Sequence, residues 1–140
     1  RGGQGKIIDG YKYERADFDT FGDTNAEKCI VGFGREFLNV YDALGELDNT
    51  FAIKLNRIKP INPNVLDLLK NVKTVYFFEE GIKSGGVGEC FGSMLAESDV
   101  TAKFRHICIE DEFIKQASVE SQLKKYRLDK ESIIDIVNQD

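Results

Sequence analysis

The chain has 140 residues, of which 41% are hydrophobic and 31% charged. This length is typical of one domain, and the composition is typical of a globular protein rather than a disordered one. No apolar run approaches the roughly 20 residues that cross a membrane, and the formal net charge of −5 repels the phosphate backbone of nucleic acids. We therefore expect neither a membrane protein nor a nucleic-acid-binding protein.

The first predicted unit is a strand followed by an amphipathic helix. The apolar run at 28–33 is typical of a buried strand. Apolar side chains then recur at helical spacing, which predicts a buried helix face made of Phe37, Val40, Tyr41 and Leu44. The polar, aromatic segment before residue 28 predicts an additional edge strand within the first 20 residues, near Tyr11 to Glu14.

The second unit repeats this order. Apolar residues alternate from Phe51 to Leu55 along a strand predicted at 50–56, so they share one face. Asn62 then predicts the N-cap of a helix, with Pro63 at its first position.

Two further units complete the pattern. The continuous apolar run at 74–79 predicts a strand that is covered on both faces. The helix after it is expected to bury Val87, Cys90, Phe91, Met94 and Leu95. A fourth strand is predicted at 104–109, and Ser118 and Asp129 are candidate N-caps of two last helices.

Strands that alternate with helices in this way predict a three-layer α/β/α fold. Its sheet is expected to be mixed, mostly parallel and built of about five strands. We expect residues 1–27 to form a linker and an edge strand, and residues 28–140 to form a single domain that is a fragment of a longer chain.

The three cysteines predict a reducing compartment, and hence a cytoplasmic protein. The chain has an odd number of cysteines, and they show no C-x-x-C spacing. They are Cys29, Cys90 and Cys108. Each lies among apolar residues, so all three are interpreted as small core residues rather than metal ligands or redox centres.

A glycine cluster separates the third strand from its helix, and two interpretations of it stay open. Gly85, Gly86 and Gly88 precede a helix N-terminus, where backbone N–H groups and a nearby Lys83 would attract an anion. The cluster lacks the spacing of a dinucleotide fingerprint and the trailing lysine of a P-loop. A turn that allows close packing of the helix on the strand is therefore favoured.

Glu79, Glu80 and His106 are the other candidate site residues. The two glutamates end the third strand at the carboxyl edge of the sheet, where one is a candidate general base, but a solvated or helix-capping role is favoured. His106 alternates with apolar residues and is interpreted as a hydrogen-bonded strand residue. Since neither a Ser-His-Asp arrangement nor metal-ligand spacing accompanies them, we predict no catalytic and no metal-binding residue.

Three segments in this order resemble a known module. They are "RIKPIN", "YFFEEGIKSGGVGECFGSML" and "FRHICIEDEFIKQASVESQLKKYRLDKESIIDIV". Together they resemble the C-terminal domain of the transketolase-like thiamine diphosphate enzymes, and within that family the 1-deoxy-D-xylulose-5-phosphate synthases. The family's strand ends, its E-E and G-G-x-G turn and its last helices correspond to residues 59–62, 79–88, 107–113 and 118–137. The chain departs from the family pattern at 108–110 and 116–117.

The resemblance implies a supporting domain of a larger transferase. Thiamine diphosphate and Mg²⁺ would be held by preceding domains of the same polypeptide and not by this chain, and the enzyme would be a homodimer. Its reaction would join pyruvate and glyceraldehyde 3-phosphate, with loss of carbon dioxide, for isoprenoid precursor synthesis. Exposed apolar residues are then expected on the isolated chain. The alternative is a free-standing α/β module that binds an anion at the glycine turn.

Overall fold

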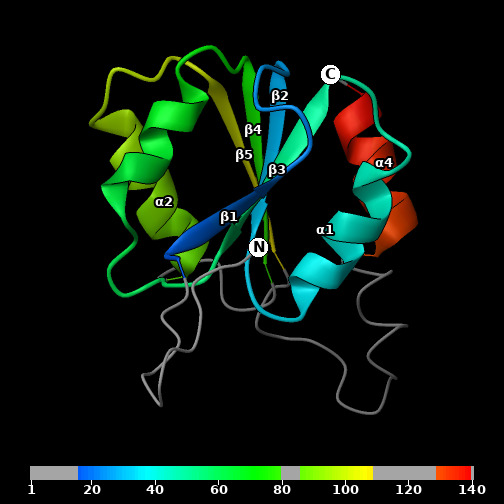
Figure 1. Ribbon diagram of the computed structural model, residues 1–140, viewed down its shortest axis with the longest axis horizontal. Coiled ribbons are helices and arrows are strands. Elements are labelled where there is room, and N and C mark those ends of the chain that lie inside the picture. Colours follow the sequence, from blue (N-terminus) through cyan, green and yellow to red (C-terminus); the bar gives the residue numbers. More distant parts are fainter. Residues whose placement is uncertain (1–15, 80–85, 109–128, 140) are drawn as a thin grey trace, which may run out of the picture.

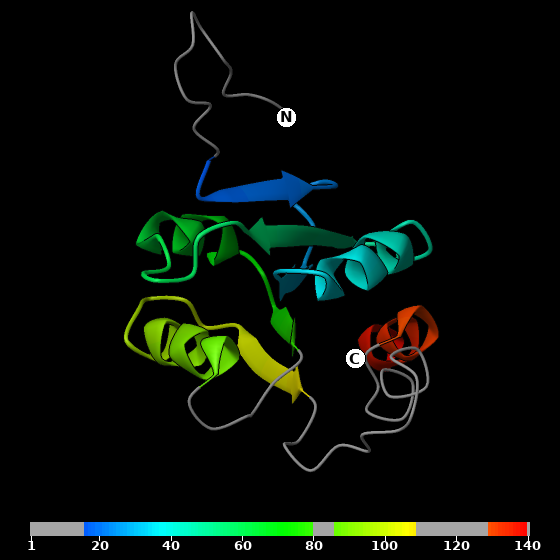
Figure 2. The ribbon, with the colours of Figure 1, turned by 90° about the horizontal axis from the view of Figure 1, so that it is seen from below.

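The computed structural model describes residues 16–79, 86–108 and 129–139. In this part of the chain a five-stranded sheet lies between two layers of helices (Figure 1, Figure 2), so the predicted three-layer α/β/α fold is confirmed. The helix predicted after Ser118 and the strand predicted near Tyr11 to Glu14 lie outside the described residues. Among the described helices, none is long and apolar enough to cross a membrane.

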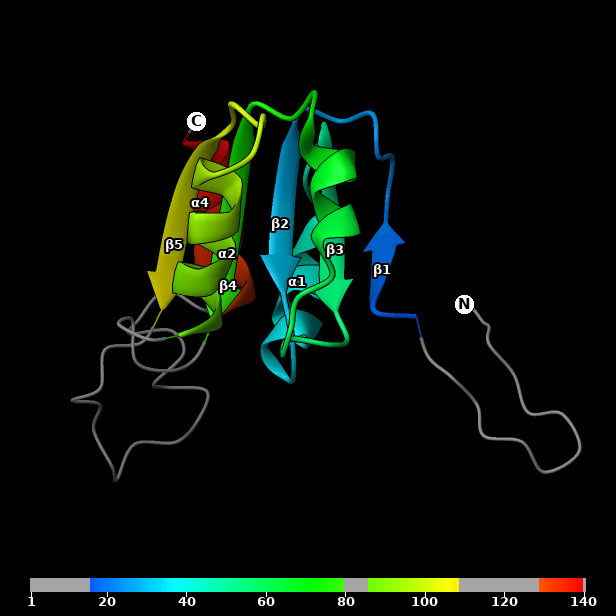
Figure 3. The same ribbon diagram turned by 90° about the vertical axis from the view of Figure 1, so that its left-hand side faces the viewer.

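The sheet is mixed and mostly parallel, as predicted. Its strands are β1 (Phe18–Phe21), β2 (Lys28–Gly32), β3 (Thr50–Leu55), β4 (Thr74–Glu79) and β5 (Lys103–Cys108). They follow the order β1-β3-β2-β4-β5, and only the pairing of β1 with β3 is antiparallel (Figure 3). The four strands that run parallel, β2 to β5, begin and end within one residue of the ranges predicted from the sequence.

Strand β1 lies at one edge of the sheet and pairs antiparallel with β3, later in the chain than the edge strand predicted near Tyr11 to Glu14. Phe18 and Phe21 pack against the cores on opposite faces of the sheet, which a strand allows for residues three apart. Just before and within the strand, Asp17 accepts a hydrogen bond from the Asn62 amide at 3.0 Å, and Asp19 accepts one from the Asn56 amide at 2.8 Å.

Helices cover both faces of the sheet. They are α1 (Glu36–Leu44), the 3-10 helix η1 (Pro63–Leu69), α2 (Val87–Ala96) and α4 (Lys130–Asn138). The helices η1 and α2 lie on one face, and α1 and α4 lie on the other (Figure 2). The predicted N-caps are confirmed, because the Asn62 side chain accepts from the Asn64 amide and Asp129 accepts from the Ser132 amide.

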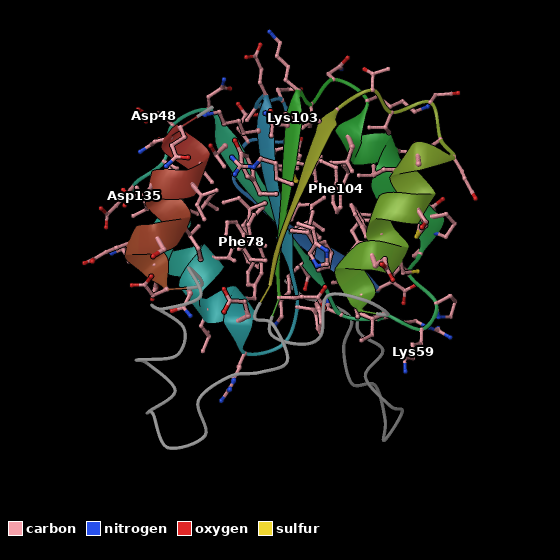
Figure 4. The ribbon with its side chains drawn as sticks, turned by 180° about the vertical axis from the view of Figure 1, so that it is seen from behind. Asp48, Lys59, Phe78, Lys103, Phe104 and Asp135 are labelled. Atoms are coloured by element: carbon pink, nitrogen blue, oxygen red, sulfur yellow. The ribbon has the colours of Figure 1, made fainter. Side chains whose placement is uncertain are left out.

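Two apolar cores result from the alternation of side chains along the strands. Phe51, Ile53 and Leu55 belong to the core beneath η1 and α2, as their predicted common face requires. Phe78 lies on the other face toward α1 and α4, whereas Phe104 of β5 lies toward α2 (Figure 4). Full burial of both faces explains the unbroken apolar run from Val75 to Phe78 in β4.

Polar contacts fix α4 at both of its ends. The Lys28 ammonium and the Tyr76 hydroxyl donate to the carbonyl of Val137, at 2.7 and 3.4 Å. A lysine ammonium near the last turn binds a carbonyl at the end of the helix where few N–H donors are available. At the other end Lys130 forms an ion pair with Glu46 at 2.5 Å, and this hydrogen bond raises the pKa of Lys130.

The predicted buried faces of two helices need correction. Tyr41 of α1 is 54% exposed, because the helix turns Phe37, Val40 and Ala43 toward the sheet and leaves Tyr41 at its margin, edge-on to the ring of Phe21.

Cys90 of α2 is also exposed, so the interpretation of this residue as part of the core is wrong. The buried face of α2 contains Gly88, Phe91 and Leu95, and Cys90 lies about 200° around the helix axis from Gly88. Cys29 is buried as predicted, and its burial raises the pKa of the thiol well above the usual value. The side chain of Cys108 lies outside the described part of the chain.

Two leucine truncations test the packing. Leu69 is fully buried in the core, whereas Leu38 is 69% exposed on α1. Leu69→Ala should lower the free energy of unfolding by about 2–5 kcal/mol, because it leaves a cavity. Leu38→Ala removes the same atoms from the surface and should change it by less than about 0.5 kcal/mol. Urea unfolding measures both, and equal losses would contradict the assignment of the core.

Candidate functional site

A polar cluster lies at the carboxyl edge of the sheet, beneath the start of α2. Glu79 is the last residue of β4, and His106 of β5 is paired in register with Phe77. Side chains of a strand alternate between faces, so Phe77 and Glu79 share the face that α2 covers. The register across the two strands therefore brings the Glu79 carboxylate next to the His106 ring.

The carboxylate of Glu79 is bound on both oxygens. Its Oε1 accepts from His106 Nε2 at 2.6 Å and from the backbone N–H of Gly88 at 2.7 Å. Its Oε2 accepts from the backbone N–H of Val87 at 3.3 Å. The side chains of Glu79 and His106 are only 3% and 10% exposed. Glu79 thus occupies the N-terminus of α2 in the way that a capping anion does.

The chemistry of this pair follows from its donors and acceptors. An ionised carboxylate only accepts hydrogen bonds, so Nε2 of His106 must carry the proton that lies between the two groups. The His106 ring lies edge-on to Phe77, with ring centroids 5.8 Å apart, and 6.2 Å from the ring of Phe104. In such apolar surroundings a carboxylate is stable only when it is hydrogen-bonded, and here three N–H groups bind it.

Two glycines allow α2 to approach the cluster. A Cβ atom at Gly88 would lie 2.2 Å from His106 Nε2 and 2.7 Å from Glu79 Oε1. A Cβ atom at Gly92, one turn later, would lie 2.8 Å from Cε2 of Phe104. His106 and Phe104 are two residues apart on β5, so their side chains lie on the same face of that strand. Gly88 and Gly92, one turn apart on α2, both face this side of β5.

The structure brings some of the sequence-predicted residues together. Glu79 and Gly88 are in contact, and Gly86 is the N-cap residue of α2. The interpretation of His106 as a hydrogen-bonded strand residue is confirmed. The remaining candidates lie outside the described residues, namely Glu80, Lys83 and Gly85. Binding of an anion by the glycine turn stays a prediction.

Sequence reasoning missed the pairing of Glu79 with His106 and the role of Gly92. The pairing depends on the register of β4 with β5, which no local pattern reports. The spacing of Gly88 and Gly92, four residues apart in a helix, was the available signal for a helix face that approaches a strand closely.

The Glu79 cluster does not fit a site for a diphosphate and Mg²⁺. Such a site needs carboxylate or other oxygen atoms that are free to reach the metal in octahedral geometry. The carboxylate of Glu79 is buried, and both of its oxygens already accept hydrogen bonds from protein groups. In the described part of the chain no group of three His, Cys, Asp or Glu residues is placed to hold a metal ion.

Comparison with known families identifies the module. The pattern of the family described as "Transketolase, C-terminal domain" matches residues 23–133. The chain belongs to this family. The residues that match the transketolase C-terminal domain include strands β2 to β5 and the Glu79–His106 cluster, whereas β1 precedes them.

Two curated relatives of this transketolase C-terminal domain share one name. The chain is 33% identical over 116 residues to the 1-deoxy-D-xylulose-5-phosphate synthase of Caldanaerobacter subterraneus, covering 79% of the chain and 19% of the relative. It is 36% identical over 117 residues to the synthase of Clostridium beijerinckii, covering 78% and 18%. The chain therefore spans about a fifth of the length of the curated relatives it matches.

A solved structure shares the fold of this transketolase C-terminal domain. It is described as "Split gene transketolase, inactive beta4 tetramer", and it superposes with a TM-score of 0.72 at 19% sequence identity. The match covers 81% of the present chain and 39% of the other. At this identity the likeness shows the fold.

Substitution of Gly88 tests the close contact between α2 and β5. Gly88→Ala should lower the free energy of unfolding by about 1–3 kcal/mol, because the new methyl group overlaps His106 and Glu79. Gly45→Ala is the matched control, since Gly45 has a right-handed helical φ of −64° and the nearest atom to its added Cβ is 3.9 Å away. That control should be stabilising by about 0.4–1 kcal/mol.

Urea unfolding of both variants gives the comparison. In a His106→Ala background the cost of Gly88→Ala should become smaller, because the overlapping ring is gone. A Gly88→Ala variant as stable as the native chain would contradict the described contact.

Proposed function

We propose that this chain is the C-terminal domain of a thiamine-diphosphate-dependent enzyme of the transketolase type, and specifically of a 1-deoxy-D-xylulose-5-phosphate synthase. The whole enzyme would join pyruvate to glyceraldehyde 3-phosphate, with loss of carbon dioxide, in the cytoplasm, as a step toward isoprenoid precursors. The observation that carries this proposal is the family match over residues 23–133, combined with relatives of that name that are 33% and 36% identical.

In this proposal the domain is not catalytic. Thiamine diphosphate would supply the carbanion chemistry of the whole enzyme, and the cofactor and Mg²⁺ would be held by preceding domains of the same polypeptide. Two facts support this division: the chain corresponds to 18–19% of these relatives, and the buried carboxylate of Glu79 already serves the N-terminus of α2.

We further propose that the domain supports a homodimer through contacts with the rest of the assembly. Among the described residues, the large apolar side chains with high exposure are Leu38 and Tyr41. They lie three residues apart on α1 and so share one side of that helix. The aromatic contact of Tyr41 with Phe21 extends this apolar surface to β1, and a covering partner would remove it from water.

A chimera tests the function. The C-terminal fifth of the Caldanaerobacter subterraneus relative would be replaced by this chain, and formation of 1-deoxy-D-xylulose 5-phosphate from the two substrates would be measured. The chimera should be dimeric and active, whereas the same relative truncated at the junction should lose about 10–100-fold in activity, the range expected when groups that support an active site are removed. A dimeric chimera with no product above the truncated control would contradict the proposed role.

Calorimetry with the isolated chain tests the placement of the cofactor. Titration with thiamine diphosphate in the presence of Mg²⁺ should give no heat of binding, because the Glu79 carboxylate is already occupied by three donors. The chimera is the positive control. Micromolar, metal-dependent binding to the isolated chain would place the cofactor site in this domain.

A further inference from the structure

We propose that Glu79 is a built-in anion that closes the N-terminus of α2 to external anions. The first turn of a helix attracts phosphate or carboxylate through its free N–H groups and its dipole. Here the chain fills this position with its own carboxylate. The proposal depends only on the contacts of Glu79, and it holds whichever enzyme the domain belongs to.

The donors around Glu79 form a complete receptor for a carboxylate. Two are the backbone N–H groups of Val87 and Gly88 in the first turn of α2, a helix of ten residues. The third is Nε2 of His106, which reaches the carboxylate from β5 at 2.6 Å. Donors from two different elements therefore converge on one anion.

The position is also sealed from solvent. The Glu79 side chain is 3% exposed, and the His106 side chain is 10% exposed behind it. The rings of Phe77 and Phe104 flank His106 and keep it at the carboxylate. An external anion would have to displace a buried group, leaving a second negative charge beside it, so the native chain should not bind phosphate here.

Removal of the carboxylate should convert this position into an open receptor. Glu79→Ala leaves two backbone N–H groups and the histidine donor unpaired in the space that the carboxymethyl group occupied. Acetate has the size and the charge of that missing group. Binding of acetate to the folded variant alone would then stabilise it in proportion to ln(1 + [L]/Kd).

The experiment follows thermal unfolding of the full chain in sodium acetate and in sodium chloride of equal ionic strength. Glu79→Ala should have a Tm at least about 5 °C below that of the native chain. Acetate should raise the Tm of this variant progressively over chloride, and it should leave the native Tm unchanged. Equal responses of the variant to acetate and chloride would overturn the proposal.

Two control variants separate receptor filling from general effects of the salt. Glu79→Gln keeps the volume of the side chain, so acetate finds no space and should not raise its Tm. Glu89→Ala removes an exposed carboxylate from the first turn of the same helix, and acetate should have no effect on it either. A rise in Tm with acetate in either control would contradict a specific receptor.

A measurement on the native chain covers the case in which Glu79→Ala does not fold. Inorganic phosphate would be titrated while the backbone amide resonances of Val87 and Gly88 are followed by NMR. These resonances should not move at millimolar phosphate, because Glu79 already accepts from both groups. Saturable shifts of the two amides would show that an external anion displaces Glu79, and the proposal would be wrong.

Discussion

One buried carboxylate connects the elements at the carboxyl edge of this sheet. Glu79 ends β4, accepts from His106 of β5 and accepts from the first turn of α2, so three elements share a single group. Removing a carboxylate from water costs free energy that only well-placed donors offset. The position of α2 relative to the sheet therefore depends on keeping these N–H groups within hydrogen-bond distance.

The glycines of α2 follow from this requirement. A short distance between the first turn and Glu79 forces the helix backbone close to β5, and a Cβ at Gly88 or Gly92 would overlap His106 or Phe104. The same approach turns Cys90 to solvent, because the glycines occupy the side of the helix that faces the strand. A charged contact thus decides which residues of an otherwise apolar helix are buried.

The family relationship gives this arrangement its context. The chain belongs to the transketolase C-terminal domain family, and it spans about a fifth of its curated relatives. In the described part of the domain the buried carboxylate of Glu79 serves the packing of α2 on the sheet, and the solved neighbour with a TM-score of 0.72 carries the same fold at 19% identity. A fold held together by backbone register and helix packing tolerates such sequence change, because many apolar side chains fill the same core.

Local patterns in the sequence determined the elements and their order. Alternation in β3, the unbroken apolar run of β4 and the caps Asn62 and Asp129 act through neighbours in the chain, so they can be recognised without the fold. Tertiary structure alone decided the partner of Glu79 and the exposure of Tyr41 and Cys90. These features depend on the register of β4 with β5 and on the rotation of each helix about its axis. Both are set by contacts between residues that are distant in sequence.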